Sequence, residues 1–191
     1  MELDTRSSLI DLAIGQVRRH GYSAFSYADL AEVAGLRKPS IHHHFPTKED
    51  LGVAMVGTYT ERFSAELERI DAGRATAIER LRGFARLYRE GLGAEQGCLC
   101  GVLASEVAVL PLRVQAEVRQ FFQMNLRWLE RILNDGRAKR QLASSVEPRR
   151  DARTVLATLQ GAMLVALSLQ QPASFDHAVD GLLAGLSVAR A

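Results

Sequence analysis

The sequence lacks the features that mark secreted and membrane proteins. It has only two cysteines in 191 residues, Cys98 and Cys100, and a pair two positions apart cannot cross-link a fold. The first residues lack the basic and then apolar pattern of a signal peptide. The longest apolar stretch, residues 155–169, is interrupted by Thr158 and Gln160 and falls short of the roughly 20 apolar residues that span a bilayer. A cytoplasmic protein without a membrane segment is therefore predicted.

An excess of one sign of charge is also missing. The 24 lysines and arginines nearly balance the 22 aspartates and glutamates, and a formal net charge of +2 is too small to identify a nucleic-acid-binding protein. The position of the basic residues has to carry that argument instead. An apolar fraction of 47% is ordinary for a folded globular protein and argues against disorder.

Signals for β-strands are almost absent, because there is no alternating run of Val, Ile and Thr and no Asn-Gly hairpin turn. Apolar residues instead recur at helical spacing, and glycines and prolines separate the periodic segments. We therefore predict an all-α protein of about nine helices. Their expected ranges are 5–20, 27–34, 38–44, 48–70, 75–91, 98–110, 112–135, 148–170 and 174–189.

Motifs of common enzyme classes are missing as well. The sequence contains no G-x-S-x-G, no glycine-rich phosphate loop and no H-E-x-x-H, and His177 is its only histidine beyond residue 44. The three successive histidines at 42–44 point about 100° apart on a helix, whereas chelating helical pairs are four residues apart. We therefore predict that the protein is not an enzyme and has neither a cofactor nor a metal site.

What the sequence does contain is a helix-turn-helix pattern. Residues 27–34 and 38–44 are two short predicted helices, joined by a tight turn that contains Gly35. Ser26 and Asp29 have the spacing of a capping box at the start of the first helix. Two short helices joined in this way are typical of proteins that read DNA.

Positive charge is concentrated at the second of these helices. Residues 37–48 contain Arg37, Lys38, Lys48 and three histidines but no acidic residue. Residues 1–51 as a whole have six Lys or Arg against seven Asp or Glu, so the excess is local. Contacts with DNA phosphates need such a local excess, which favours DNA binding by this segment.

The segment Ser26–Leu51 resembles the DNA-binding region of the tetracycline-repressor (TetR) family of transcriptional regulators. The cap, the Ala34-Gly35 turn, the aromatic-rich second helix and Phe45-Pro46-x-Lys48 all occur in register. The rest of the chain is similar to the family only in the number and length of its helices. The resemblance implies a DNA-binding domain at residues 1–51 and an effector-binding and dimerisation domain at residues 52–191. Its implied partners are double-stranded operator DNA, a small-molecule effector and a second copy of the chain.

The resemblance also implies which side chains contact DNA. Ser26 and Tyr27 would touch phosphates, Arg37, Lys38 and Ser40 would reach base edges, His42 and His43 would contact backbone and bases, and Lys48 would hold a phosphate at a helix N-terminus. Ile41 and Phe45 are expected in the core. Because His42 stands where the family usually has Tyr, we expect operator affinity to rise as falling pH charges the imidazoles. The alternative for Ser26 is a cap worth about 1 kcal/mol.

Aromatic side chains on the later helices are candidates for an effector pocket, since pockets between bundle helices are built from such groups. They are Tyr59, Phe63, Phe84, Tyr88, Phe121 and Trp128. The alternative is that they form plain core. Glu106 shares a helical stripe with Leu99 and Leu103, so its carboxylate is paired, neutralised or in contact with a ligand. A salt bridge to a neighbouring helix, or an exposed edge position, is the alternative.

Cys98 is a further candidate for effector sensing. It follows Gly97 at the start of a predicted helix, and a helix N-terminus favours the reactive thiolate form of a cysteine. The start Gly97-Cys98-Leu99 resembles that of TetR-family members that sense electrophiles or oxidants through a cysteine. Alternatively, Cys98 is a small buried apolar residue.

The last two predicted helices are apolar around most of their surface, which indicates burial on more than one side. The resemblance implies that they pair with their mates in a homodimer, as a palindromic operator requires. The expected interface residues are Leu156, Leu159, Met163, Leu167, Leu182 and Leu186. The alternative is that one chain buries both helices alone.

Together these features predict a repressor that a small molecule or electrophile releases from a palindromic operator. The effector would bind among the fourth to eighth helices and shift the fourth, which leads directly to the DNA-binding helices. Two alternatives stay open: an activator or ligand-independent regulator, and a ligand-binding helical protein whose DNA-binding segment is idle. The basic, acid-free residues 37–48 argue against the second alternative.

Overall fold

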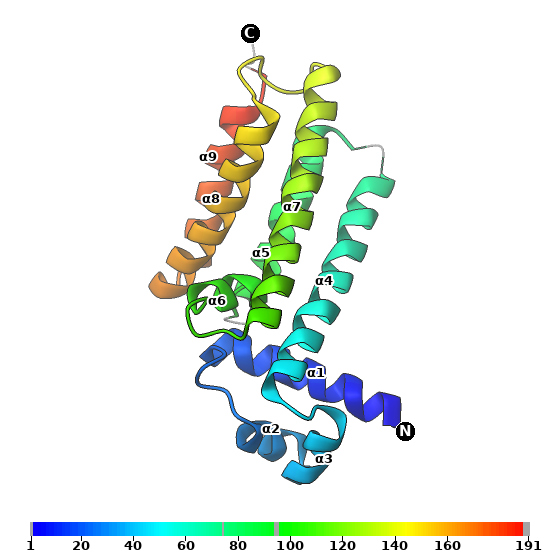
Figure 1. Ribbon diagram of the computed structural model, residues 1–191. Coiled ribbons are helices and arrows are strands. Elements are labelled where there is room, and N and C mark those ends of the chain that lie inside the picture. The colour runs from blue at the N-terminus through cyan, green and yellow to red at the C-terminus, as the bar shows by residue number, and fades with distance from the viewer. Residues whose placement is uncertain (1, 74, 94–95, 189–191) are drawn as a thin grey trace. The chain divides into compact units, whose positions relative to one another are not determined.

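The computed structural model describes residues 2–73, 75–93 and 96–188 (Figure 1). Within these ranges the chain is all-α, as predicted, and has nine helices in the predicted order. Their bounds are α1 Glu2–His20, α2 Tyr27–Ala34, α3 Lys38–His44, α4 Lys48–Ala72, α5 Ala77–Leu92, α6 Leu99–Ser105, α7 Leu112–Ala138, α8 Pro148–Leu169 and α9 Pro172–Leu186. An isolated antiparallel β-bridge joins Leu142 to Ser187.

Capping boxes explain where the first helices begin. At the start of α2, Ser26 accepts bonds from backbone N–H groups while its own N–H donates to Asp29 at 2.8 Å. At the start of α4, Asp50 N donates to Thr47 Oγ1 at 3.1 Å, and Thr47 N donates to the Asp50 carboxylate at 3.2 Å. Each box satisfies backbone donors that the first helical turn leaves without partners. The predicted starts of α2 and α4 are confirmed.

Helix α6 is shorter than predicted, because it ends at Ser105 instead of Leu110. The backbone N–H groups of Glu106 and Val107 bond to carbonyls three residues back, at 3.0 and 3.3 Å, so the chain tightens and leaves the helix. Ser105 Oγ donates to Val102 O at 2.7 Å and occupies a carbonyl in the last turn. Glu106 is therefore the C-cap of α6, not a member of its apolar stripe.

The sequence predicts that α7 ends at residue 135, directly before Gly136, but the helix continues to Ala138. A Cβ atom at Gly136 would overlap with the Cβ of Ala77, at the start of α5, and would lie 2.8 Å from Leu142 Cδ1. Glycine is therefore needed here for close approach of neighbouring chain segments, not as a helix stop.

The described residues form two compact units. Unit 1 comprises residues 2–62 and 98–121, which are α1 to α3, α6 and the first parts of α4 and α7. Unit 2 comprises the described residues of 63–97 and 122–188, which are the other parts of α4 and α7 with α5, α8 and α9. The boundary predicted at residue 51 concerns functional domains and stays a prediction.

In unit 1, α1 packs on α2 and α6, and α2 packs on α3. Apolar side chains from these helices form its core, and the fully buried ones include Leu9, Val17, Leu30, Ile41, Phe45 and Leu51. The expectation that Ile41 and Phe45 anchor α3 in the core is confirmed. With these side chains buried, α3 turns its remaining residues outward.

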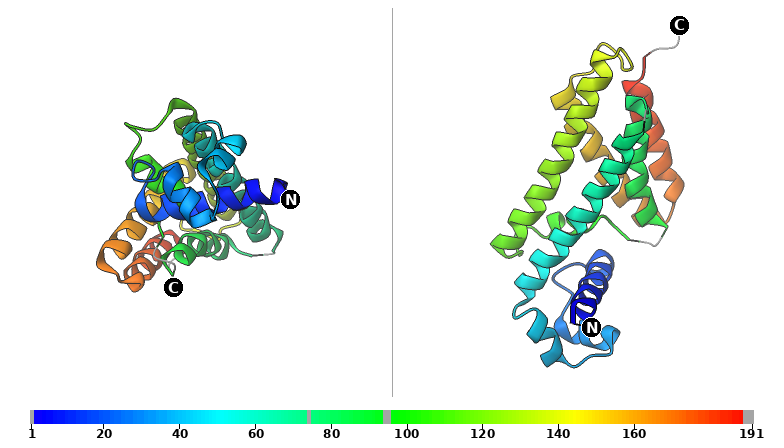
Figure 2. Two further views of the ribbon diagram at one scale, coloured as in Figure 1. Left: turned by 90° about the horizontal axis from the view of Figure 1, so that it is seen from below. Right: turned by 90° about the vertical axis from the view of Figure 1, so that its right-hand side faces the viewer.

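In unit 2, α8 packs on α9, and both pack on α5 (Figure 2). Among the described residues, α8 is the one helix long and apolar enough to cross a membrane by length and composition. It is longer than the apolar stretch 155–169 because it begins at Pro148. Core helices of soluble proteins pass the same test. Only 33% of the most apolar 18-residue segment of α8 is buried within the chain. Much apolar surface of α8 is therefore exposed in a single copy.

Candidate DNA-binding and effector sites

The helix-turn-helix is closed by a turn that glycine alone adopts without strain. Gly35 has φ 64°, in the left-handed region, and its N–H bonds to Glu32 O. The next N–H, that of Leu36, bonds to Ala31 O at 3.0 Å. These two bonds form the usual glycine ending of a helix and turn the chain directly into α3.

The outward side of α3 carries most of the predicted DNA contacts. Arg37, Lys38, His42 and His43 are exposed, and Ser40 is half-buried. His42 Nδ1 lies 3.2 Å from Pro46 O, to which it donates when that nitrogen is protonated, and its ring packs edge-on against Tyr27. Arg37, Lys38 and His43 are exposed to solvent, so a DNA duplex could contact them.

Two other predicted contacts have internal partners. The Tyr27 hydroxyl shares its proton between Phe45 O at 2.9 Å and Thr47 O at 2.6 Å, and so ties α2 to the segment that follows α3. Burial, with the nearby Asp50 carboxylate, raises the pKa of Tyr27 to about 12, so the hydroxyl stays a donor. Ser26 Oγ donates to Asp29 at 2.6 Å within the capping box. Their contacts with phosphates stay predictions.

Lys48 points into unit 1. Its ammonium donates to Tyr22 O at 2.6 Å and lies over the rings of Tyr22 and Phe25, at 4.5 and 5.6 Å from their centroids. Burial lowers the pKa of Lys48, and the charge of Glu106 opposes that shift. The bond to Tyr22 uses one of the three ammonium donors, so the phosphate contact that the resemblance implied for Lys48 stays a prediction.

The Glu106 carboxylate has internal partners, so a contact between Glu106 and an effector stays a prediction. The carboxylate accepts bonds from the backbone N–H groups of Tyr22 and Ser23, both at 2.8 Å, and from the Ser23 hydroxyl. Burial raises the pKa of Glu106, but these hydrogen bonds and the charge of Lys48 outweigh it and hold the pKa below its usual value. The partners lie more than 80 residues away along the chain, which is why helical periodicity did not find them.

The predicted effector residues fall into two groups. In unit 1, Tyr59 OH lies 3.7 Å from Cys98 Sγ, and the Tyr59 and Phe121 rings are 5.6 Å apart. Burial raises the pKa of Tyr59 well above its usual value, and the same cause raises that of Cys100. Cys98 is only 3% exposed, so its thiol has little access to solvent.

The second group lies in unit 2 and packs as an aromatic cluster. The rings of Phe84 and Trp128 stack at 5.3 Å, and Tyr88 lies 5.4 Å from Phe84. Phe63 meets both Phe84 and Tyr88 edge-on at 5.9 Å. Trp128 Nε1 donates to Asp71 at 3.0 Å, which satisfies the indole N–H.

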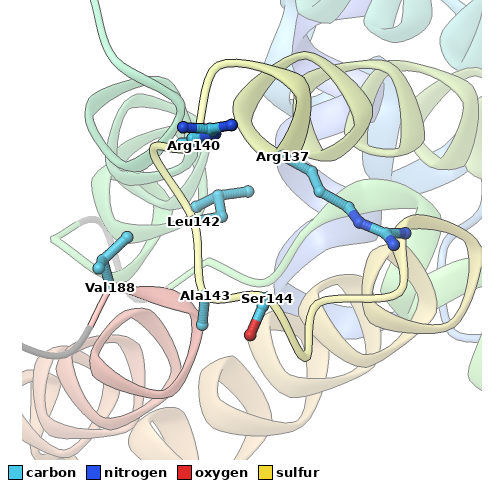
Figure 3. Close-up of a pocket in the computed structure, with 6 residues that line it drawn as sticks. All are labelled: Arg137, Arg140, Leu142, Ala143, Ser144 and Val188. Atoms are coloured by element: carbon cyan, nitrogen blue, oxygen red, sulfur yellow. The ribbon is translucent and has the colours of Figure 1, made fainter.

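Open pockets in unit 2 involve other residues. One, of about 610 Å³, is lined by six residues around the end of α7 (Figure 3), which are Arg137, Arg140, Leu142, Ala143, Ser144 and Val188. A second, of about 690 Å³, includes Glu66, Glu79 and several arginines. Neither contains a predicted effector residue. The two arginines of the first pocket lie at the C-terminal end of α7, Arg137 in its last turn and Arg140 just beyond it, where positive charge is favoured without any ligand.

Most of the residues predicted for the dimer interface are covered by their own chain, and their contact with a partner stays a prediction. Leu156, Leu159, Met163 and Leu186 are buried within their own chain, so they present little surface to a partner. Leu167 and Leu182 are partly exposed. The apolar residues that α8 does expose are Leu164, Val165 and Leu169, each more than half accessible.

Residues at the α1–α2 turn were missed by the sequence interpretation. Gly21 has φ 89°, and a Cβ there would collide with the Glu106 carboxylate. The sequence signal for this turn is Gly21 itself, which directly follows the predicted helix 5–20.

A capped first helix, a glycine turn and a second helix with an outward basic face define a DNA-binding module of the helix-turn-helix class. Residues 9–55 match the family described as "Bacterial regulatory proteins, tetR family". Residues 77–182, more than half of the chain, match "Tetracyclin repressor-like, C-terminal domain". The chain belongs to the TetR family of transcriptional regulators, which is not a family of enzymes.

Similar proteins cover nearly the whole chain. A TetR-family regulator from Agrobacterium tumefaciens, of solved structure, is 32% identical with a TM-score of 0.94, over 98% of this chain and 100% of that one. The transcriptional regulator AcuR of Cereibacter sphaeroides is 28% identical over 83% of this chain and 74% of AcuR. The HTH-type transcriptional repressor NemR of Escherichia coli is 26% identical over 86% of this chain and 85% of NemR.

Proposed function

We propose that this TetR-family regulator is a cytoplasmic repressor that binds a palindromic operator as a homodimer and leaves it when a small molecule binds. The observation that carries the proposal is the basic outward face of α3. Arg37, Lys38, His42 and His43 are exposed there, and no acid lies between residues 37 and 48. A short helix with this charge suits the major groove, where Arg and Lys reach guanine edges.

The uncovered apolar surface of α8 and α9 supports the homodimer. Leu164, Val165 and Leu169 are exposed on α8. Cβ atoms built at Gly161 on α8 and Gly185 on α9 would meet nothing within 4 Å, so a partner helix could approach both helices closely. A contiguous apolar face of this kind marks an interaction site. A two-fold dimer would place two α3 helices on two half-sites.

The aromatic cluster of unit 2 is the proposed place for the effector. Phe84, Tyr88 and Trp128 supply apolar surface from α5 and α7. On α8, which packs against α5, the buried Gln160 Nε2 has no hydrogen-bond partner among the described residues. A buried amide without a partner is costly, so a ligand acceptor atom at that position would be favoured.

The test is DNA binding by the purified protein. DNA from upstream of its gene is titrated at several salt concentrations, with and without small electrophiles and organic acids. We expect salt-sensitive binding that one of these compounds releases. Arg37→Ala should weaken operator binding by about 1–3 kcal/mol. Lys139→Ala, which removes an exposed positive charge outside the helix-turn-helix, is the matched control.

Each outcome separates the open alternatives. Absence of binding to every upstream fragment at low salt would reject the proposal of a repressor. It would favour the alternative of a ligand-binding protein whose DNA-binding segment is idle. Binding that no compound releases would favour a ligand-independent regulator. A reporter fused to the bound promoter distinguishes a repressor, whose loss raises expression, from an activator, whose loss lowers it.

A further inference from the structure

We infer that Glu106 is a positioning residue for the DNA-binding helices, which it orders by holding the turn between α1 and α2 without touching DNA. The inference rests on the proposed operator binding and adds a residue that the family's DNA contacts do not include. It starts from one geometric fact: a single carboxylate on α6 receives three hydrogen bonds from two successive residues of that turn.

The two carboxylate oxygens divide these bonds. Tyr22 N donates to Oε1 at 2.8 Å, while Ser23 N at 2.8 Å and the Ser23 hydroxyl both donate to Oε2. Gly21, at φ 89°, brings the backbone so close that any side chain there would strike Oε1. The turn is therefore shaped to receive this carboxylate. We call Glu106, Tyr22, Ser23 and Lys48 the turn clasp.

Lys48 closes the clasp from the other side. The Lys48 ammonium donates to the backbone carbonyl of Tyr22 at 2.6 Å. In return, the Tyr22 hydroxyl donates to the backbone carbonyl of Lys48 at 3.1 Å. Burial, with the charge of Glu49, raises the pKa of Tyr22 to about 12, so its hydroxyl remains a donor at all working pH values. The backbone N–H, the carbonyl and the hydroxyl of Tyr22 are thus all engaged.

The stability of α6 does not explain a glutamate at residue 106. Glu106 is the C-cap of α6, where the helix dipole disfavours negative charge and favours Lys or Arg. Its carboxylate is also partly buried, which adds a desolvation cost. The three bonds from the turn offset both costs. Because the dipole of α6 disfavours Glu106 while the turn between α1 and α2 supplies its hydrogen bonds, we place the role of Glu106 at that turn.

A short path leads from the turn to the DNA-binding helix. Only residues 24 and 25 separate Ser23 from Ser26, the N-cap of α2. Tyr27, the first residue of α2, binds Phe45 O and Thr47 O at the far end of α3. A turn released by Glu106 therefore frees the start of α2, and through Tyr27 it also loosens α3.

The clasp also ties the DNA-binding helices to α6. Glu106 is at one end of α6, and Cys98, buried beside Tyr59, is the N-cap at the other end. A displacement of this seven-residue helix would carry the carboxylate with it. An event at either end of α6 would therefore reach Tyr22 and Ser23.

Charge alone predicts the opposite effect of a mutation, which makes the test sharp. Removing a negative charge from a DNA-binding unit should strengthen DNA binding through simple electrostatics. If Glu106 acts by positioning, removing it should weaken binding. The log-log slope of affinity against salt should stay unchanged, because no phosphate contact is lost.

The experiment compares operator affinity and salt slope for Glu106→Gln, Glu106→Ala and Glu61→Gln. Glu61 is exposed on α4 within unit 1, so its variant removes the same charge without the clasp. Since hydrogen bonds to charged groups are among the stronger ones, we expect Glu106→Ala to bind about tenfold more weakly at an unchanged slope. Glu106→Gln retains one acceptor oxygen and should lie between Glu106→Ala and the wild type. Unchanged or tighter binding by both Glu106 variants would overturn the inference.

Hydrogen exchange in the free protein tests the clasp without DNA. The Tyr22 and Ser23 amides should exchange faster in Glu106→Gln than in the wild type, while amides of unit 2 keep their rates. Equal rates at Tyr22 and Ser23 would overturn the inference, even if operator binding changed. Should the wild type bind no operator, the proposed function fails and the exchange rates alone decide the clasp. Ser23→Ala, which removes one of the three donors, serves if the Glu106 variants do not fold.

Discussion

Replacement of Gly136 by alanine tests the packing of unit 2 directly. A Cβ at this position would overlap with Ala77 Cβ and lie 2.8 Å from Leu142 Cδ1. At Gly57, on α4, an added Cβ would meet nothing within 4 Å. Gly57 is inside α4 and Gly136 is in the last turn of α7, so the gain in helix propensity from Gly to Ala is at least as large at Gly57 as at Gly136.

The magnitude follows from that comparison. Alanine in a helix interior is favoured over glycine by about 1 kcal/mol, so Gly57→Ala should raise the free energy of unfolding by up to this amount. Gly136→Ala receives at most this gain and adds an overpacking cost of about 1–3 kcal/mol. The free energies of unfolding of the two variants should therefore differ by at least about 1–3 kcal/mol, with Gly136→Ala the less stable.

Urea unfolding followed by circular dichroism measures this difference. The variants are compared at one protein concentration, because the proposed dimerisation would make stability concentration-dependent. Equal slopes of the free energy of unfolding against urea concentration show that unfolding exposes the same amount of surface in each variant. If Gly136→Ala were as stable as Gly57→Ala, the close approach of α5 to α7 at Gly136 would be refuted.

Four further predictions follow from the structure. If the chain forms the proposed dimer, Leu164→Glu on the exposed face of α8 should convert it to monomers in sedimentation velocity, whereas a dimer that persists would place the interface elsewhere. Tyr27→Phe should destabilise unit 1 by about 1 kcal/mol and weaken operator binding at an unchanged salt slope. Hydrogen bonds hold the pKa of Glu106 below the ordinary 4.5, so its stabilising contribution is present above pH 4.5 and is lost as pH falls through the folded pKa. The free energy of unfolding, measured with urea between pH 3 and 6, should therefore fall less steeply with falling pH for Glu106→Gln than for the wild type. Cys98 should react with iodoacetamide far more slowly in the native protein than in urea, by mass spectrometry, and equal rates would show that its thiol is accessible.

The DNA-binding helices could be predicted from sequence because their chemistry is local. The boxes of Ser26 with Asp29 and of Thr47 with Asp50 each join residues three apart. The glycine turn at Gly35 also uses bonds within five residues. A pattern of residues within one short segment therefore determines where α2, α3 and α4 begin.

The roles of Glu106 and Gly136 could not be predicted in this way. Glu106 meets Tyr22 across 84 residues, and Gly136 is needed because of Ala77, in another helix. In each case the sequence signal had a local interpretation, an apolar stripe for Glu106 and a helix stop for Gly136. The interpretation failed because a tertiary partner, absent from the local sequence, sets the role of the residue.

For the proposed dimer interface, too, a sequence pattern within one helix does not identify the exposed side. Periodicity shows that α8 is apolar around most of its surface, but it does not say which side faces its own chain. In the structure Leu159 and Met163 point inward, four residues apart on one side, whereas Leu164 and Val165 are exposed. An apolar helix that one copy half covers needs a partner on the other half. Leu159 and Met163 therefore stabilise the fold of the single chain, while Leu164 and Val165 support the proposed homodimer.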